Sequence, residues 1–311
     1  MRCDSIINEK GWLPVKTRQS KKRKLAGILV LLLALLVSVG LNVYHIFWGY
    51  DSYLQSTDQI YVMEAGILRN NIRFRDGEAY EISYDFDNEE YTALRETYGI
   101  EQIAGEGTEL ERALRLMDEF APRLHHKSDY DNHVDMNALS LLAYSLDNKS
   151  QGVNCRSKAQ ILNEMCLAME IYARKVWLMP SSMYDNDCHV VNEIWDSGLG
   201  KWVMLDITNN EYWVDETGTP LSILEIREKG AMGKFCTPVH PGDSLESLER
   251  LKEKYLGDFL YIMKNMVYLE YCGAYTTGDG GTHYLLFPEN LDTDYEYLIS
   301  QEACTKSPVP K

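Results

Sequence analysis

The chain has 311 residues, of which 47 are acidic and 31 are basic, so its formal net charge is −16 at pH 7. This acidic balance argues against a nucleic-acid partner, because phosphate backbones are bound by clustered Lys and Arg. The sequence also has no internal repeat, low-complexity tract or Gly-rich phosphate loop, which excludes solenoids and P-loop enzymes.

A basic segment and a long apolar run open the chain. Residues 25–50 contain no Asp, Glu, Lys or Arg. A helix rises about 1.5 Å per residue, so about 20 apolar residues cross a hydrocarbon core of about 30 Å. We therefore predict a transmembrane helix over residues 25–48 that contacts the lipid bilayer, with Trp48 and Tyr50 at its interface.

A cleaved signal peptide is the alternative interpretation of this segment. Its apolar region would be about 7 to 15 residues long and would end in a small-residue cleavage site. The one candidate site, Ser38-Val39-Gly40, lies inside the apolar run and no cysteine follows it, which favours a retained anchor. The positive-inside rule then keeps residues 1–24 in the cytoplasm and places the domain after Tyr50 outside it.

The exported part is more acidic than the whole chain. The first 24 residues hold 8 basic and 2 acidic side chains and residues 25–50 hold none, so the remainder holds 23 and 45, a net charge of −22. Such a surface promotes solubility, and it agrees either with cationic substrates or with no partner at all.

Six of the seven cysteines lie in the exported part: Cys155, Cys166, Cys188, Cys236, Cys272 and Cys304. An even number invites a disulfide framework, but about 260 residues bury a full core without cross-links. We interpret most of these cysteines as small buried side chains, with room for one or two disulfides.

Two elements are predicted before the chemically interesting region. Residues 80–86 alternate polar and apolar side chains like a strand. Thr108 and Glu111 form a capping box that begins a helix, and Pro122 ends it.

A polar loop, residues 125–133, precedes an apolar helix expected over residues 136–146. The loop contains three His and two Asp, which are metal-ligating residue types. Their spacing fits no fixed metal motif, and the calcium-loop pattern fails because the sixth position lacks Gly and the twelfth lacks Glu. We therefore predict no metal site and no cofactor.

Cys155 follows the turn-like residues 151–154 and begins a helix. One face of that helix carries Cys155, Ala159, Leu162, Cys166 and Met169. At a helix N-terminus the dipole and the unpaired N–H groups favour a thiolate and lower a thiol pKa from about 8.5 towards 3.5 to 7.5. Cys166, deep in the same helix, has no such advantage. Taken alone, Cys155 is better interpreted as an inert buried thiol, and it is the His and Asp that follow in the sequence that favour a catalytic role.

His189 and Asp206 fall on a predicted β-hairpin. Residues 189–195 and 201–206 alternate like strands on either side of the turn 196–200. Pairing centred between residues 197 and 198 makes His189 and Asp206 direct cross-strand neighbours. A centre half a residue away places His189 opposite Ile207 and turns Asp206 to the other face, and the sequence does not fix this register.

If the two side chains meet, Asp206 orients the imidazole of His189 while the other ring nitrogen faces the thiol of Cys155. This is the arrangement of nucleophile, base and orienting acid used in covalent catalysis. The alternative is a His–Asp pair that only stabilises the hairpin. Cys188 is expected to point away from the site, because successive strand residues face opposite sides.

Three blocks, residues 155–175, 189–193 and 201–206, resemble the core of the transglutaminase-like superfamily, which has a papain-like fold. The resemblance implies an α+β domain in which the helix that bears Cys155 packs on an antiparallel sheet. It also implies that Cys155 is the nucleophile, His189 the general base and acid, and Asp206 the orienting carboxylate. Calcium, which some animal relatives use, is not implied.

The sequence departs from the family pattern at two glycines. Relatives usually place Gly two residues before the Cys, where this chain has Val153, with Gly152 one step earlier. The family turn Gly-Ile-x-Ala-Arg is matched by residues 171–174 with Glu170 in place of its Gly. The oxyanion donors would be the backbone N–H of Cys155 and one upstream side chain, for which Gln151 is the nearest candidate.

We thus predict a single-pass, membrane-anchored cysteine enzyme of bacterial type with five parts: a cytoplasmic tail (1–24), a membrane helix (25–48), a stem leading into the exported domain (49–107), a transglutaminase-like core (108–234) and an α+β C-terminal extension packed on the core (235–311). Its partner is a peptide or protein substrate, whose amide bonds react through a thioester and end in hydrolysis, crosslinking or deamidation. The alternative is an inactive surface binding or scaffold domain, which the displaced glycine favours.

Overall fold

The computed structural model describes residues 18–46, 62–182, 184–278 and 281–310. The chain divides into two compact units, Met1–Ile60 and Tyr61–Lys311. In the first unit, helix α1 (Arg18–Tyr44) contains the stretch Arg23–Tyr44, whose mean hydropathy of 2.6 and 22 residues make it long and apolar enough to span a membrane. A signal sequence meets the same criteria. Trp48 and Tyr50 lie outside the described residues.

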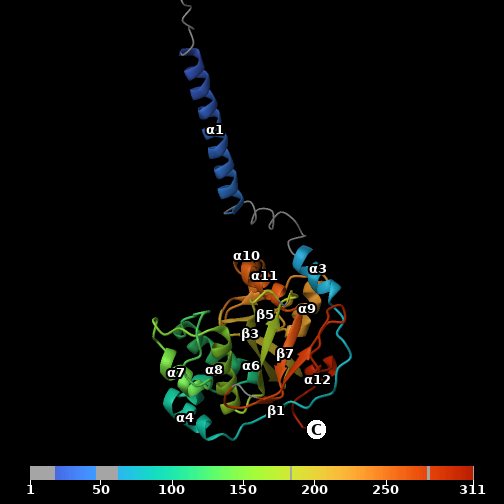
Figure 1. Cartoon of the computed structure of the whole chain (residues 1–311). Helices are drawn as coiled ribbons and strands as arrows, with labels where there is room; N and C mark the ends of the chain where they lie inside the picture. The colour runs from blue at the N-terminus through green and yellow to red at the C-terminus, as the bar shows by residue number, and fades with distance from the viewer. Residues whose placement is uncertain (1–17, 47–61, 183, 279–280, 311) are drawn as a thin grey trace, which may run out of the picture. The chain divides into compact units, whose positions relative to one another are not determined.

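An antiparallel sheet forms the centre of the second unit (Figure 1). In the described residues it has seven strands in the order β6-β5-β4-β3-β2-β7-β9. Their bounds are β2 (Ala173–Met179), β3 (His189–Asp196), β4 (Lys201–Asp206), β5 (Glu211–Val214), β6 (Thr237–Val239), β7 (Tyr268–Cys272) and β9 (His283–Leu286). A separate parallel pair joins β1 (Ser83–Tyr84) to β8 (Ala274–Tyr275).

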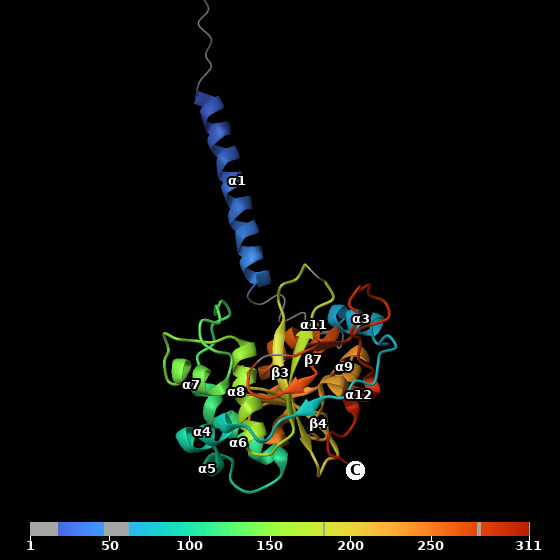
Figure 2. The same ribbon diagram turned by 60° about the horizontal axis from the view of Figure 1, so that its bottom comes forward.

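Helices cover both faces of the large sheet (Figure 2). One face carries the helices drawn in teal and green, namely α4 (Glu89–Tyr98), α5 (Ile100–Ala104), α6 (Glu109–Phe120), α7 (Ala138–Ser145) and α8 (Cys155–Ala168). The other face carries α3 (Val62–Asn70), α9 (Ile223–Ala231), α11 (Leu256–Asn265) and α12 (Gln301–Thr305). Helix α10 (Leu248–Lys254) packs against the edge strand β6. Short 3-10 turns lie at η2 (Ala121–Arg123) and η3 (Leu245–Ser247). The α+β fold class predicted from the sequence is confirmed, with the Cys-bearing helix packed on an antiparallel sheet.

Helix α8 lies at the centre of the core. Every residue from Ser157 to Ala168 is buried, including Lys158, Gln160 and Glu164. The sequence pattern indicated one buried face, but the sheet covers one side of α8, and α4, α6 and α7 cover the others. The polar side chains that a surface helix would expose are therefore enclosed by protein.

Local signals in the sequence differ in how well they predicted the elements. The capping box of Thr108 and Glu111 is present at the start of α6, as predicted. The strand expected over residues 80–86 is wrong in length, because only Ser83–Tyr84 pair with another strand. The helix expected over residues 136–146 is shorter and begins at Ala138, where the side chain of Asn137 caps it.

The turn after α8 explains one of the two glycine departures. Glu170 has φ +58°, a left-handed conformation that favours glycine. The chain then enters β2, where the guanidinium of Arg174 binds the carboxylate of Glu193 at 2.6 Å. Both side chains are buried, and the guanidinium lies 3.8 Å from the ring centroid of Trp202. Arg174 therefore stabilises the sheet, and Glu170 occupies a left-handed position of the kind that favours the Gly expected there from the sequence pattern.

Candidate active site

Cys155 is the first residue of α8. The side chain of Asn154 caps the helix by accepting a hydrogen bond from the backbone N–H of Ser157 at 3.0 Å. The first N–H groups of a helix lack intrahelical acceptors, so the backbone N–H of Cys155 is available to an anion near the thiol. The predicted position of Cys155 at a helix N-terminus is confirmed.

Gly152 lies where another segment comes close to the backbone. A Cβ atom at this position would lie 2.9 Å from the carbonyl oxygen of His125 and 2.9 Å from Cβ of Lys127. The backbone of Val153 pairs with the same segment, since its N–H donates to His125 and its carbonyl accepts from Lys127, both at 3.0 Å. The glycine before Cys155 is thus displaced by one residue because the approaching chain meets Gly152.

The hairpin register differs from both registers considered from the sequence. Asn192 pairs with Leu205 and Asp196 with Lys201, so the next step along the ladder brings Asp206 opposite Val191. His189 lies two residues from Val191 and therefore on the same face of β3. The predicted direct pairing of His189 with Asp206 is wrong, but a shift of two residues preserves the face, and the two side chains meet diagonally.

His189 and Asp206 form a buried hydrogen-bonded pair. Nε2 of His189 lies 2.8 Å from Oδ2 of Asp206, and both side chains are almost completely buried. The carboxylate of Asp206 also accepts from the backbone N–H of Thr208 at 2.9 Å and from Nδ2 of Asn209 at 3.2 Å. These donors fix the position of the Asp206 carboxylate, and the pairing at Nε2 leaves Nδ1 of His189 for another partner.

That partner is the half-buried thiol of Cys155, which hydrogen-bonds the imidazole. Burial opposes ionisation of the thiol, but the hydrogen bond and charge of His189, together with the backbone N–H of Val190, outweigh it and lower the pKa of Cys155. Burial likewise disfavours the charged imidazole, but the charge of Asp206 and hydrogen bonds from Asp206 and Cys155 raise the pKa of His189 to about 10. Both shifts favour a thiolate–imidazolium pair.

A cavity of about 500 Å³ opens onto this pair. Its walls include the aromatic side chains of Trp177 and Tyr261, and the ring of Tyr261 meets the imidazole of His189 edge-on at 5.4 Å between centroids. His126 also lines the cavity, and burial lowers the pKa of its imidazole. The polar loop 125–133, which contains metal-ligating residue types, therefore contributes part of the wall of this cavity. Among the described residues, no cluster of His, Cys, Asp or Glu is arranged to hold a metal ion.

Two sequence expectations about neighbouring residues differ from the structure. Cys188 lines the cavity, contrary to the expectation that it lies away from the site, because the cavity reaches both faces of the sheet: it is lined by His189 on one face and by Trp177, the strand partner of Val190, on the other. The side-chain oxygen of Gln151 accepts from Asn148, and Gln151 does not line the cavity, so this geometry gives no support to Gln151 as an oxyanion donor. The six described cysteines are free thiols, without the disulfides for which the sequence left room.

A pair of carboxyl groups beside the site was missed by the sequence reasoning. Glu211 is the cross-strand partner of Asp206, and its carboxyl group hydrogen-bonds that of Asp258 in the cavity wall. Burial and the neighbouring charges of Asp206 and Asp258 raise the pKa of Glu211 to about 9. Its place directly after the hairpin was the available signal, but the partner comes from α11, about 50 residues later in the chain.

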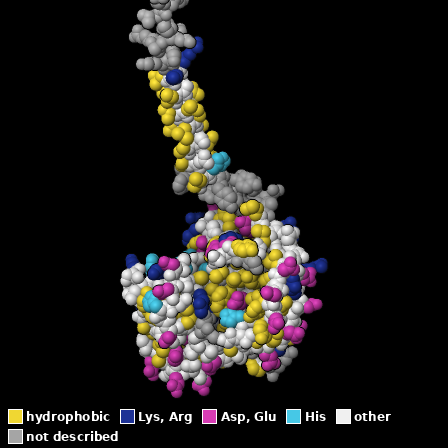
Figure 3. Space-filling view, in the orientation of Figure 1, with side chains coloured by type: hydrophobic (Ala, Val, Ile, Leu, Met, Phe, Trp, Pro, Cys, Tyr) yellow, Lys and Arg dark blue, Asp and Glu magenta, His cyan; other side chains and the backbone are white. Residues whose placement is uncertain are grey.

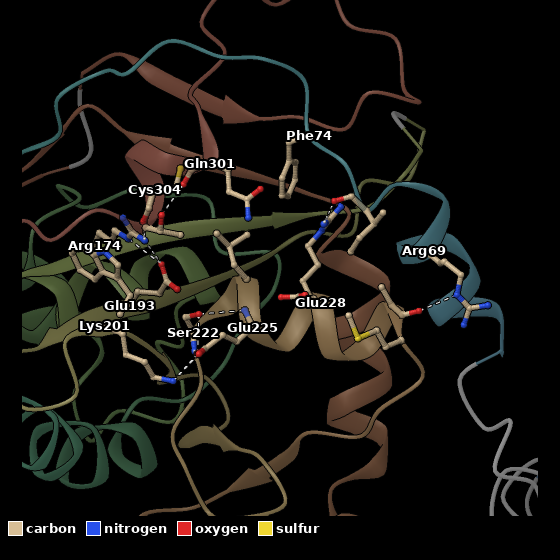
Figure 4. A pocket seen from close by; sticks show the side chains of 17 residues that line it. Arg69, Phe74, Arg174, Glu193, Lys201, Ser222, Glu225, Glu228, Gln301 and Cys304 are labelled. Atoms are coloured by element: carbon tan, nitrogen blue, oxygen red, sulfur yellow. Dashed lines mark hydrogen bonds and ion pairs between the residues drawn. The ribbon is translucent and has the colours of Figure 1, made fainter.

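A larger cavity, of about 730 Å³, lies between the sheet, α9 and α12 (Figure 4). In the close-up, Arg174 points to Glu193, and Lys201 reaches Glu225, whose carboxylate it binds at 2.7 Å. Cys304 lines this cavity, but burial raises the pKa of its thiol to about 12. These lining residues are thus held in ion pairs or kept neutral, and the thiol with the lowered pKa lies in the smaller cavity.

The family comparison agrees with this geometry. Residues 96–207 match the model of the transglutaminase-like superfamily. This part of the chain is a transglutaminase-like domain. The matched segment runs from the end of α4 to just beyond Asp206, so the transglutaminase-like domain contains Cys155, His189 and Asp206 together with the helix and hairpin that carry them.

Comparisons with curated proteins and with solved structures give little further information about the chain. No curated protein matches the chain. A solved structure from Cytophaga hutchinsonii, named as a candidate cysteine protease, is 17% identical, with 40% of each chain covered and a TM-score of 0.31. A likeness of that extent supports no inference about this chain.

Proposed function

We propose that the chain is a membrane-anchored, extracytoplasmic cysteine enzyme that acts on amide bonds of peptides or proteins through a thioester. The observation that carries this proposal is the continuous hydrogen-bonded series from the thiol of Cys155 through the imidazole of His189 to the carboxylate of Asp206. A His–Asp pair that only stabilises the hairpin does not require a neighbouring half-buried thiol with a lowered pKa, whereas a catalytic site does.

In this mechanism the thiolate of Cys155 attacks the amide carbonyl carbon and forms a C–S bond. His189 then gives its proton to the amide nitrogen as the C–N bond breaks and the amine leaves. A water molecule, or a second amine, loses a proton to His189 and attacks the thioester, which releases the acyl group and restores the thiolate. Water gives hydrolysis or deamidation, and an amine gives crosslinking.

Charge on the tetrahedral oxygen needs hydrogen-bond donors. The backbone N–H of Cys155 at the helix N-terminus supplies one. For the second we propose His126, which lines the cavity and whose lowered pKa keeps the ring neutral with one N–H to donate. Its Nε2 pairs with the hydroxyl of Ser128 at 3.0 Å, so Nδ1 is the atom assigned to the substrate oxygen.

The displaced glycine favoured an inactive scaffold as the alternative function. Gly152 now has a packing reason in its contacts with His125 and Lys127, so its position no longer argues against catalysis. The apolar run of α1 and the basic residues on its N-terminal side support a retained anchor with the transglutaminase-like domain outside the cytoplasm.

The test uses low concentrations of iodoacetamide on the full chain near pH 6.5, with labelled cysteines mapped by mass spectrometry. We expect selective labelling of Cys155 that falls in His189→Ala. An unreactive Cys155, or equal labelling of the exposed and half-buried cysteines, contradicts the enzyme. Labelled casein and an amine such as dansylcadaverine then separate hydrolysis from amine transfer.

Topology is tested with a reporter fused after Lys311. A reporter active only outside the cytoplasm is expected. Activity of the reporter in the cytoplasm overturns the orientation, and release of a shortened soluble chain overturns the retained anchor in favour of a signal peptide.

A further inference from the structure

A second pocket lies next to the cavity that contains Cys155. It has a volume of about 550 Å³, and half of the described residues in its walls are aromatic: Tyr268, Glu270, Gly281, Thr282, His283, Leu285, Tyr295 and Tyr297. Tyr295 and Tyr297 expose 38% and 47% of their surfaces, which is a large exposure for neighbouring aromatic residues. In Figure 3, hydrophobic side chains gather in the middle of the face where Figure 1 labels β3 and β7.

The two pockets adjoin across Trp177. Its side chain lines the Cys155 cavity, and its ring lies 5.3 Å from that of His283, centroid to centroid, in the second pocket. Trp177 on β2 is also the cross-strand partner of Glu270 on β7, which in turn pairs with Leu285 on β9. One row of side chains on one face of the sheet therefore leads from the thiol to the aromatic pocket.

Three polar groups in the described walls of this pocket are paired, namely the side chains of Glu270, His283 and Tyr295. The carboxylate of Glu270 pairs with the imidazole of His283, whose hydrogen bonds with Cys272 and Glu270 raise its pKa to about 10. The hydroxyl of Tyr295 donates to the carbonyl of His283 at 2.9 Å. Glu270 and His283 therefore bind each other, and the tyrosine rings together with Leu285 supply the apolar and aromatic surface that the pocket offers a ligand.

The edge of the sheet beside this pocket is already paired. The N–H of Leu285 donates to the carbonyl of Tyr297, and the N–H of Ile299 donates to the carbonyl of Leu285, both at 3.0 Å. A ligand therefore cannot add as a further strand to β9 at Leu285. It must lie across the face of the sheet and place a side chain between the tyrosines.

We propose that this pocket binds an apolar side chain of the same polypeptide whose amide is attacked by Cys155, which rests on the proposed function. Neighbouring strands lie about 4.8 Å apart, so the row from Trp177 to Leu285 covers about 10 Å, and an extended chain advances about 3.3 Å per residue. The side chain in the pocket therefore belongs to a residue about three positions beyond the one that contacts Trp177. The pocket selects polypeptides with Leu, Phe or a similar residue there.

A carbohydrate is the other ligand that aromatic surfaces attract. Recognition of sugar hydroxyls also requires carboxylates, amides or hydroxyls with free hydrogen-bonding capacity. Glu270 and His283 are engaged with each other, and the hydroxyl of Tyr295 with the carbonyl of His283. The lining groups left for a sugar are thus hydroxyls alone, without a carboxylate or an amide side chain, while the tyrosine rings and Leu285 supply apolar surface, which favours the apolar side chain.

The experiment measures kcat and KM of the full chain in lipid nanodiscs with ten-residue peptides that carry Leu or Ser at one position at a time. We expect one position, about three residues from the reacting amide, where Leu lowers KM about tenfold relative to Ser and leaves kcat unchanged, as burial of one apolar side chain implies. Tyr297→Ser should abolish this preference. Tyr297→Phe should keep it, as should Tyr184→Ser, which changes an exposed tyrosine outside both pockets.

Three results overturn the inference while leaving the enzyme intact: turnover without any preference for Leu, a preference that survives in Tyr297→Ser, or competition by chitooligosaccharides in place of an apolar preference. A protein without enzymatic activity is recognised separately. For this purpose the Leu and Ser peptides are labelled with a fluorophore, and their binding to Cys155→Ala is measured by anisotropy. In that background, Tyr297→Ser should weaken binding of the Leu peptide about tenfold, and equal binding of the Leu and Ser peptides contradicts the pocket assignment.

Discussion

The two cysteines of α8 have the same chemistry, share one helix and differ in ionisation. Cys155 lies at the N-terminus, where His189 and the backbone N–H of Val190 overcome burial and lower its pKa. Cys166 lies three turns later, is completely buried, and has a pKa raised to about 12 by that burial. The helix positions the first thiol, and the imidazole from the hairpin lowers its pKa. The positive charge of Arg112 lowers the pKa of Cys166, as His189 lowers that of Cys155, but its effect is smaller than the opposing effect of burial.

The largest test of this contrast is removal of each thiol. Cys155→Ala should lower turnover of the best peptide by at least about a thousandfold, because no other group forms the thioester. Cys166→Ala should leave turnover unchanged and lower the free energy of unfolding by about 1 kcal/mol through a small cavity. Initial rates and urea unfolding of both variants measure this, and equal activity losses would show that the two thiols are not functionally distinct.

The next largest effect concerns the oxyanion at the N-terminal end of α8. His126→Ala should lower kcat about a hundredfold, since loss of one oxyanion donor costs roughly 10²–10³ in rate. Gln151→Ala is the matched control and should leave kcat unchanged, because Gln151 binds Asn148 and does not line the cavity. A loss of activity in Gln151→Ala with none in His126→Ala would reverse the assignment.

The pH dependence of alkylation sharpens the contrast. The thiolate is the reactive form and the folded pKa of Cys155 is lowered, so its alkylation rate should reach half of its maximum below pH 9. In His189→Ala the lowering contributions of the imidazole are lost while burial remains, so the half-maximum should move above that pH and the rate at pH 6.5 should fall at least about tenfold. Stopped-flow alkylation with site mapping measures both curves. If the pH midpoint of alkylation is the same in His189→Ala as in the unchanged protein, His189 is not the cause of the lowered pKa of Cys155.

The smallest expected effect lies at the other end of the helix. Glu170 adopts φ +58°, and a left-handed conformation costs a residue other than glycine roughly 1–2 kcal/mol. Glu170→Gly should therefore raise the free energy of unfolding by about 1 kcal/mol and leave turnover unchanged. Glu170→Ala is the control without this gain, and equal stability of the two variants in urea would show that the backbone conformation carries no cost.

The sequence predicted where α8 begins but not how completely α8 is buried. The turn before Cys155 and the helical spacing after it were local, and the structure confirms the helix start with Asn154 as its cap. The burial of Lys158, Gln160 and Glu164 could not be predicted from the same pattern, because it depends on α4, α6 and α7, which come from distant parts of the chain. The spacing of apolar residues predicts which face of a helix packs against the core, but the number of buried faces depends on the elements that surround the helix.

The site shows the same division. By itself the sequence determined that a thiol lies at a helix N-terminus and that a His and an Asp lie on a hairpin, because capping, periodicity and turns are local properties. Only the tertiary structure decided the register that brings His189 to Asp206 diagonally, the cavity wall formed by His126, and the carboxyl pair of Glu211 and Asp258. These contacts join segments separated by 17 to over 60 residues, and their geometry depends on packing in three dimensions, which no local pattern specifies.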